Sequence, residues 1–130
     1  MFPHSVTIYN KYKLDGVEKW QRTVIDRVQW NAIKGTIARK TGISSADSLQ
    51  LIIPYDYRSN SAYVDPDTWK GLTDRAGYWT LQSGDTVVNG SIDYEVVKSS
   101  SELSQYSDSR IITSIDAYDY GLPHWEVSGK

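Results

Sequence analysis

The chain of 130 residues contains no cysteine. Disulfides, zinc–thiolate sites and thiol nucleophiles are therefore excluded, and the chain is compatible with a reducing cytosol. Phenylalanine and methionine are nearly absent, with one residue each, whereas tyrosine and tryptophan contribute 10 and 5 residues. Because tyrosine and tryptophan favour strands and combine a large contact area with a polar edge, this composition predicts a β domain that uses part of its surface for contacts.

The chain also has no large excess of positively or negatively charged side chains. The chain has 14 Lys and Arg against 16 Asp and Glu, so its formal net charge is −2. A nucleic-acid surface would show a basic excess or a basic stripe. We therefore expect no sequence-specific binding of nucleic acid.

Long apolar runs are missing as well. No stretch could span a bilayer, and the N-terminus MFPHSVTIYN has neither the basic region nor the apolar run of a signal peptide. We therefore expect no membrane association. The length fits one domain, residues 1–130, which can bury a core without disulfides.

The strongest local signal lies in residues 77–96, GYWTLQSGDTVVNGSIDYEV. Asn89-Gly90 separates two β-prone runs there, and this dipeptide suits a type I′ turn, which needs positive φ at both central residues. The pattern predicts a hairpin in which residues 86–88 pair with residues 92–96.

The first 35 residues predict a three-stranded meander. Residues 4–13 alternate between apolar and polar side chains, as in a half-buried strand. Asp15-Gly16 is a second hairpin signal, after which residues 17–25 would pair back on the first strand. Asp26-Arg27 predicts a tight turn or a bulge before a third strand at residues 28–32.

The middle of the chain alternates between loop and short elements. Residues 36–48 are polar and contain a glycine, and we expect them to be mostly loop. Residues 49–53 form a short apolar run that predicts a mostly buried strand, which Pro54 ends because proline cannot donate to a ladder. Residues 101–106 could form one helical turn.

Two further strands are expected near the C-terminus. In residues 110–120 the alternation predicts that Ile111 and Ile115 share one face and that Ile112 lies on the other. Gly121-Leu122-Pro123 breaks this strand, and residues 124–127 form a short closing strand. The whole pattern predicts an all-β fold, a small β-barrel or sandwich of about seven to nine short antiparallel strands with at most short helical turns.

Residues 55–74 form one long polar and aromatic loop, and a loop of this length is typically functional or mobile. Within it, Asp65 would be the N-cap of a short helical turn with Pro66 at its first position. Four aromatic side chains crowd this loop: Tyr55, Tyr57, Tyr63 and Trp69.

No pattern of catalytic or metal-binding residues stands out. His4 and His124 could meet if the first and last strands paired, but no further ligands occur at a recognisable spacing. Serine, histidine and aspartate are present without a motif that orders them. We expect no metal, no cofactor and no enzyme activity, and a hydrolase using an unrecognised pair of carboxylates is a weaker alternative.

Several segments together resemble a known class of proteins. They are the strand-first N-terminus HSVTIYNKYK, a Trp-containing second strand, WTLQSGDTVVNG at residues 79–90, and the ending IITSID at residues 111–116 with HWEV at residues 124–127. The combination spans most of the chain. It resembles small head–tail connector proteins of phages and prophages of Gram-positive bacteria, of the head-closure (stopper) or tail-completion type.

This resemblance implies a non-enzymatic virion structural protein. It implies a small β-barrel with one or two long loops, assembled as a homo-oligomeric ring below the portal and adaptor, where it helps to seal the packaged DNA and joins the tail. Portal, adaptor and tail proteins would be the partners. The protein would lie in the virion, and in the cytoplasm of the host bacterium during assembly.

Residues 55–74 fit this role as a ring-forming or channel-facing loop. Aromatic anchors are enriched in protein interfaces, so the candidate protein-contact residues are Tyr55, Tyr57, Tyr63 and Trp69. Some of them could instead cover the end of the barrel. The same side chains also fit an alternative from another class, a carbohydrate- or ligand-binding β domain of a phage or bacterial surface-recognition protein.

Overall fold

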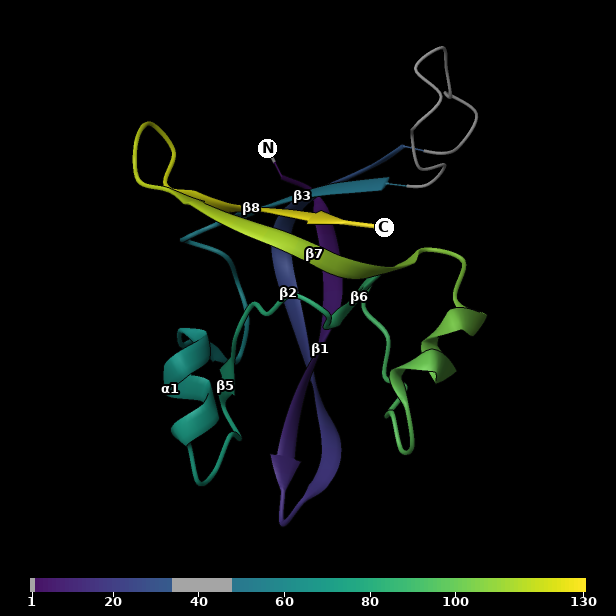
Figure 1. Ribbon diagram of the computed structural model, residues 1–130. Coiled ribbons are helices and arrows are strands. Elements are labelled where there is room, and N and C mark those ends of the chain that lie inside the picture. The colour runs from purple at the N-terminus through teal and green to yellow at the C-terminus, as the bar shows by residue number, and fades with distance from the viewer. Residues whose placement is uncertain (1, 34–47) are drawn as a thin grey trace.

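The computed structural model describes residues 2–33 and 48–130. Six strands close an antiparallel barrel in the order β1-β2-β3-β8-β7-β6, which confirms the predicted all-β class and the barrel (Figure 1). The bounds of the barrel strands are β1 His4–Leu14, β2 Val17–Ile33, β3 Ser48–Pro54, β6 Thr86–Asn89, β7 Ser109–Tyr118 and β8 His124–Gly129.

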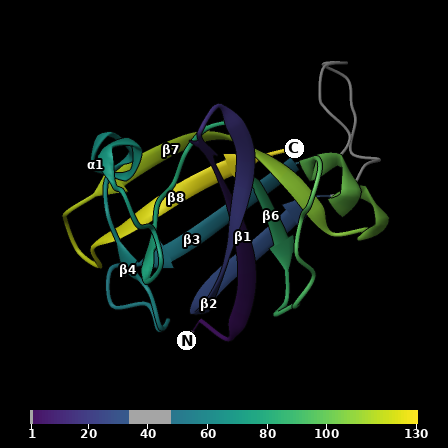
Figure 2. The ribbon, with the colours of Figure 1, turned by 90° about the horizontal axis from the view of Figure 1, so that it is seen from below.

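Smaller elements are attached to the barrel. β4 (Ala62–Tyr63) and β5 (Tyr78–Trp79) form a two-stranded parallel sheet, and between them lies the short helix α1 (Pro66–Gly71). A 3-10 helix, η2 (Ser100–Gln105), precedes β7. Figure 2 shows α1 and the η2 segment on opposite sides of the β1–β2 hairpin. No helix of the described part is long and apolar enough to cross a membrane.

The β1–β2 hairpin is the longest pairing in the molecule. Asp15 and Gly16 have φ angles of 54° and 79°, as a type I′ turn requires, so the predicted turn is confirmed. Arg27 has a φ of 69°, and the register shifts at this level between β1 and β2, which identifies the predicted irregularity as a bulge.

The predicted three-stranded meander is wrong, because β2 is a single strand of 17 residues. Its first part pairs with β1, and residues 29–33 pair with β3. A bulge increases local twist and bends a strand, which lets one strand change partner at the corner of a barrel. One long strand, β2, therefore takes the place of the two strands that the alternation predicts at residues 17–25 and 28–32.

The predicted hairpin at Asn89-Gly90 is also wrong. β6 already pairs with β1 on one edge and with β7 on the other, so no free edge remains for residues 92–96. Instead Thr7 holds the chain after the turn, since its hydroxyl donates to the Gly90 carbonyl at 2.8 Å and accepts from the Ile92 N–H at 3.0 Å. Residues 92–96 have no strand structure.

Two apolar clusters lie on the two faces of β1. The barrel interior holds Val6, Ile8, Ile25, Val28, Trp30, Leu49, Leu51, Ile53, Trp79, Leu81, Val87, Ile112 and Val127. A second, smaller cluster is built from Tyr9, Val88 and Leu103, with residues of the 92–106 segment packed against it. The segment after Gly90 therefore covers the other face of β1 and β6, so that this face is buried as well.

The last strands differ from the predicted alternation in one respect. Ile112 lies in the barrel core and Ile115 packs against it, whereas Ile111 is half exposed. A register irregularity between Ile112 and Ser114 inserts one residue, which places Ile112 and Ile115 on the same face. The closing strand is confirmed as β8.

Both expected helical turns are present. Asp65 caps α1, where it accepts the Thr68 N–H at 3.4 Å, and Pro66 occupies the first helical position. In η2, Ser99 and Glu102 form a capping box. Of the loop predicted for residues 36–48, residues 36–47 lie outside the described residues, and Ser48 is the first residue of β3.

Candidate functional site

An aromatic cluster packs against the barrel core. Trp79 is fully buried, and the rings of Tyr57 and Tyr63 meet it edge-on, each with a centroid separation of 5.2 Å. Trp125 of β8 packs on Tyr63 at 4.4 Å and on Tyr55 at 4.5 Å. The structure thus brings together three of the four candidate aromatic residues, and Tyr57 and Tyr63 serve mainly as packing.

Hydrogen bonds fix these rings in place. The Tyr57 hydroxyl accepts the Tyr63 N–H at 2.9 Å, and the Tyr55 hydroxyl donates to the Asp119 carboxylate at 3.3 Å. Burial raises the pKa of Tyr63, and the negative charge of Asp65 raises it further. Tyr63 therefore stays neutral at ordinary pH, and Tyr55 is the member of the cluster that borders solvent.

Trp69, the fourth candidate, lies elsewhere and is only 1% exposed. The cap and the proline that start α1 place its ring against β1, where Nε1 donates to the Lys11 carbonyl at 3.2 Å. Its ring also meets Tyr12 edge-on at 6.1 Å. The expectation that Trp69 presents a contact surface is therefore wrong, and it offers no open face for a sugar either.

Exposed apolar side chains gather instead on the end of β7 and the turn that follows it, residues 116–122, which we call the β7–β8 tip. Tyr120 is 88% exposed, Leu122 49% and Tyr118 40%. Tyr118 stacks on His124, with ring centroids 5.2 Å apart and an interplanar angle of 18°. The tip projects from one end of the barrel (Figure 1). Clusters of exposed apolar side chains mark interaction sites.

This tip was not among the contact surfaces predicted from the sequence. The available signal was two tyrosines and a leucine placed in and around the Gly121-Leu122-Pro123 break, where polar residues are the norm. Tyr55 joins the tip through its hydrogen bond to Asp119, so one of the four candidate residues does border this surface.

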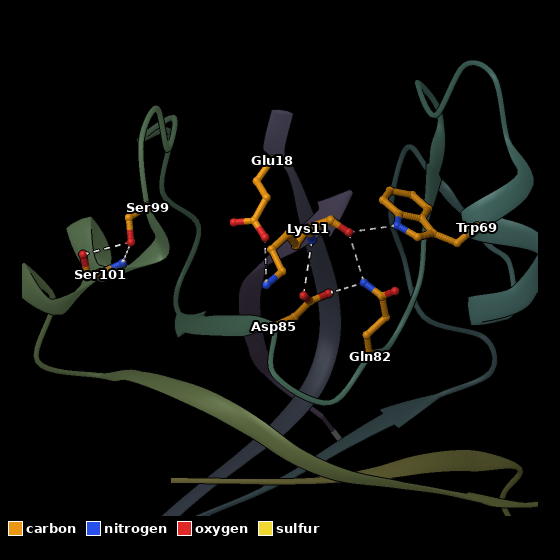
Figure 3. A network of polar contacts seen from close by, with 7 residues as sticks. All are labelled: Lys11, Glu18, Trp69, Gln82, Asp85, Ser99 and Ser101. Carbon is orange, nitrogen blue, oxygen red and sulfur yellow. Dashed lines mark hydrogen bonds and ion pairs between the residues drawn. The ribbon is translucent and has the colours of Figure 1, made fainter. Parts of the chain in front are cut away.

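A buried polar network lies between β1 and the segment that joins β5 to β6 (Figure 3). The Asp85 carboxylate accepts from Asn10 Nδ2 at 2.9 Å, Gln82 Nε2 at 2.8 Å and the Lys11 N–H at 3.3 Å. Burial raises the pKa of Asp85, although these hydrogen bonds favour the charged form. The network ties the hairpin to the segment that follows β5.

A groove of about 360 Å³ lies beside this network, between the hairpin and α1, and we call it the hairpin groove. Glu18 is its one carboxylate, and it pairs with Lys11 at 3.7 Å. Four cations line the groove: Lys11, Lys13, Lys70 and Arg75. Because the whole chain has a net charge of −2, this local positive charge stands out from the rest of the molecule.

Arg75 is the most firmly positioned of these cations. Its guanidinium carbon lies 4.7 Å from the centre of the Tyr12 ring and 5.3 Å from that of Trp69. Nη2 donates to the Lys70 carbonyl at 3.2 Å, whereas Nε is buried and has no hydrogen-bond partner in the described part of the chain. The aromatic rings thus hold a fixed cation at the groove.

Other ionisable side chains do not assemble into a site. Among residues 2–33 and 48–130, no three His, Asp or Glu side chains are grouped as metal ligands. His4 accepts the Trp30 N–H at 3.1 Å, and His124 lies 3.2 Å from Glu126. Because β1 and β8 are not neighbours in the barrel, the two histidines do not meet.

The chain was also compared with known proteins. A family model described as "Family of unknown function (DUF6751)" matches residues 1–130. No curated protein and no solved structure matches the chain.

Proposed function

The chain belongs to this family of unknown function, and we propose that it is a non-enzymatic structural protein of a phage or prophage virion. It acts at the head–tail connector, in head closure or tail completion, through protein–protein contacts within a ring. Its location is the virion, and the cytoplasm of the host bacterium during assembly.

The β7–β8 tip is the observation that best supports this proposal. A tyrosine that is 88% exposed, beside a half-exposed leucine, costs solubility in a free monomer and is useful where a partner covers it. Tyrosine is also among the residues that dominate binding energy in interfaces. The closed barrel leaves few free strand edges, so contacts of this kind depend on side chains of turns and loops.

Co-expression with portal, adaptor and tail proteins of the same phage or prophage tests the proposal. We expect a complex that survives purification, and incorporation of the chain into virions. Binding to the portal or adaptor would indicate head closure, and binding to a tail protein alone would indicate tail completion.

Matched variants link the result to the tip. Tyr120→Ser with Leu122→Ser should weaken the complex, whereas Val97→Ser, at a valine that is also exposed but lies in the segment before η2, should leave it intact. No complex with any neighbouring gene product, together with absence from virions, would contradict the proposal.

A further inference from the structure

We propose that the hairpin groove of one copy of this chain binds the β7–β8 tip of a second copy. The inference rests on the proposed function, because it names the contact through which copies would join in a ring. Its two halves are already present on every copy.

The groove suits an acidic, aromatic segment. Its lining contains four cations and one carboxylate, and Lys13 and Lys70 make no ion pair with any described residue. Arg75 is held between aromatic rings, so little side-chain entropy is lost when it binds a carboxylate. An arginine in this arrangement offers a planar fork that matches a carboxylate in two hydrogen bonds.

The tip has the complementary character. Asp116 lies directly opposite Glu126 in the β7–β8 pairing, and like charges in this position destabilise a sheet. Asp119 adds a third carboxylate, whose described contact is the Tyr55 hydroxyl. Of these three carboxylates, only that of Glu126 has a basic neighbour among the described residues, the ring of His124, which is charged only when protonated. A cationic partner would relieve this repulsion and cover the exposed rings of Tyr118 and Tyr120.

Among the described residues, no hydrogen bond or ion pair joins the tip to the groove of the same copy. Figure 1 shows the β7–β8 tip and the β1–β2 turn at opposite ends of the molecule, with α1 between them on the same side as the tip. The proposed contact is between copies and joins two different surfaces. A contact of this kind is heterologous, and it produces a ring when the rotation closes or an open filament when it does not.

Charge reversal in the full-length chain tests this contact. Lys70→Glu changes the groove, Asp119→Lys changes the tip, and Lys98→Glu is a control at an exposed lysine outside both. We expect sedimentation velocity to show salt-sensitive self-association of the wild type and of Lys98→Glu. Each single reversal should weaken association at least about tenfold, since removing one partner of a close charge pair typically costs more than this.

Mixing provides the decisive result. The Lys70→Glu chain keeps an intact tip and the Asp119→Lys chain keeps an intact groove, so an equimolar mixture should associate although each variant alone does not. A photo-crosslinker placed at position 120 should link to residues 69–75 of another copy. A wild type that stays monomeric up to its solubility limit, a mixture that fails to associate, or a crosslink elsewhere would each overturn the inference.

Other occupants of the groove give different outcomes. If Lys70→Glu lowers binding to a double-stranded DNA oligonucleotide while self-association is unchanged, the groove takes phosphates and the inference is overturned. If the chain and its Lys70→Glu variant enter virions equally well, the result supports the connector role and contradicts this contact between copies. If neither the wild type nor Lys70→Glu enters virions but the mixture of Lys70→Glu and Asp119→Lys associates, the result supports the contact between copies and contradicts the connector role.

Discussion

Glu102 anchors the segment that covers the outer face of the barrel. Its carboxylate accepts the N–H groups of Val97, Lys98 and Ser99 at 3.2, 2.7 and 3.0 Å, and the Tyr94 hydroxyl at 2.8 Å. These hydrogen bonds, that from Lys98 foremost, lower the pKa of Glu102 from 4.5 to about 2. A lowered pKa in the folded state means that the charged form stabilises the fold.

The pH dependence of stability follows from this shift. The contribution of Glu102 is complete above its unfolded pKa of 4.5 and is lost as the pH falls towards 2. The thermal stability of the wild type should therefore fall as the pH is lowered through this window. The stability of Glu102→Gln should fall less, because the variant has no carboxylate at position 102 to take up a proton. Glu18→Gln, at an exposed glutamate, is the control and should follow the wild type. Parallel profiles for the wild type and Glu102→Gln would contradict the prediction.

Trp69 gives a second test at the scale of one residue. Because its ring is 1% exposed and docks α1 on β1, Trp69→Ala should lower the free energy of unfolding by about 3–5 kcal/mol. Tyr120→Ala removes a ring that is 88% exposed and should change it by less than about 0.5 kcal/mol. Urea titration measures both values. An unchanged midpoint for Trp69→Ala would show that its ring does not support the fold.

At the scale of elements, the β1–β2 turn depends on backbone conformation alone. Gly16 has a φ of 79°, and an added Cβ there would meet nothing within 4 Å. Gly16→Ala should therefore cost about 1 kcal/mol, the price of a left-handed conformation for an L residue. Gly71, at the end of α1, also has open space but no positive φ, so Gly71→Ala should be neutral or stabilise by up to about 1 kcal/mol. Equal effects in chemical denaturation would contradict this distinction.

The same turn signal succeeded at one place and failed at another. Asp15-Gly16 produces a hairpin because β1 and β2 have free edges to offer each other there, whereas at Asn89-Gly90 both edges of β6 are already occupied. A dipeptide encodes the bend but not the partner of the strand that follows. The hairpin turn at Asp15-Gly16 was therefore predicted correctly, whereas at Asn89-Gly90 only Gly90 has a positive φ, so neither the predicted type I′ turn nor the predicted pairing forms.

The candidate site shows the same limit. An aromatic side chain in a long loop can face solvent or the core, and local sequence does not separate Tyr55, which borders solvent, from Trp69, which is buried. The sequence carries a signal for the tip in its two tyrosines and one leucine, but their exposure follows from how β7 and β8 leave the barrel. The hairpin groove depends on α1 meeting β1 across 58 positions of sequence.

At the scale of the whole molecule, strand count and turn spacing were enough to predict an all-β fold, a barrel or a sandwich. The closure of the barrel could not be predicted from the sequence. It depends on the bulge at Arg27, which lets β2 pair with both β1 and β3, and on the register irregularity after Ile112. Both insert one residue and thereby change which side chains face the core. Such irregularities have weak sequence signals, so strand order and register emerged only from the structure.

Closure has a consequence for dynamics that can be measured. Residues 6–9 of β1 are paired on both sides, with β2 and with β6, whereas residues 11–14 are paired with β2 alone. Amide hydrogens in the first part should exchange only through global unfolding, and those towards the Asp15-Gly16 turn should exchange through local fraying of the hairpin. Hydrogen exchange followed by NMR should therefore show protection falling along a single strand. Uniform protection along β1 would mean that the hairpin and the barrel open together. A rise in protection of residues 11–14 at high concentration, absent in Asp119→Lys, would show that another copy covers the hairpin.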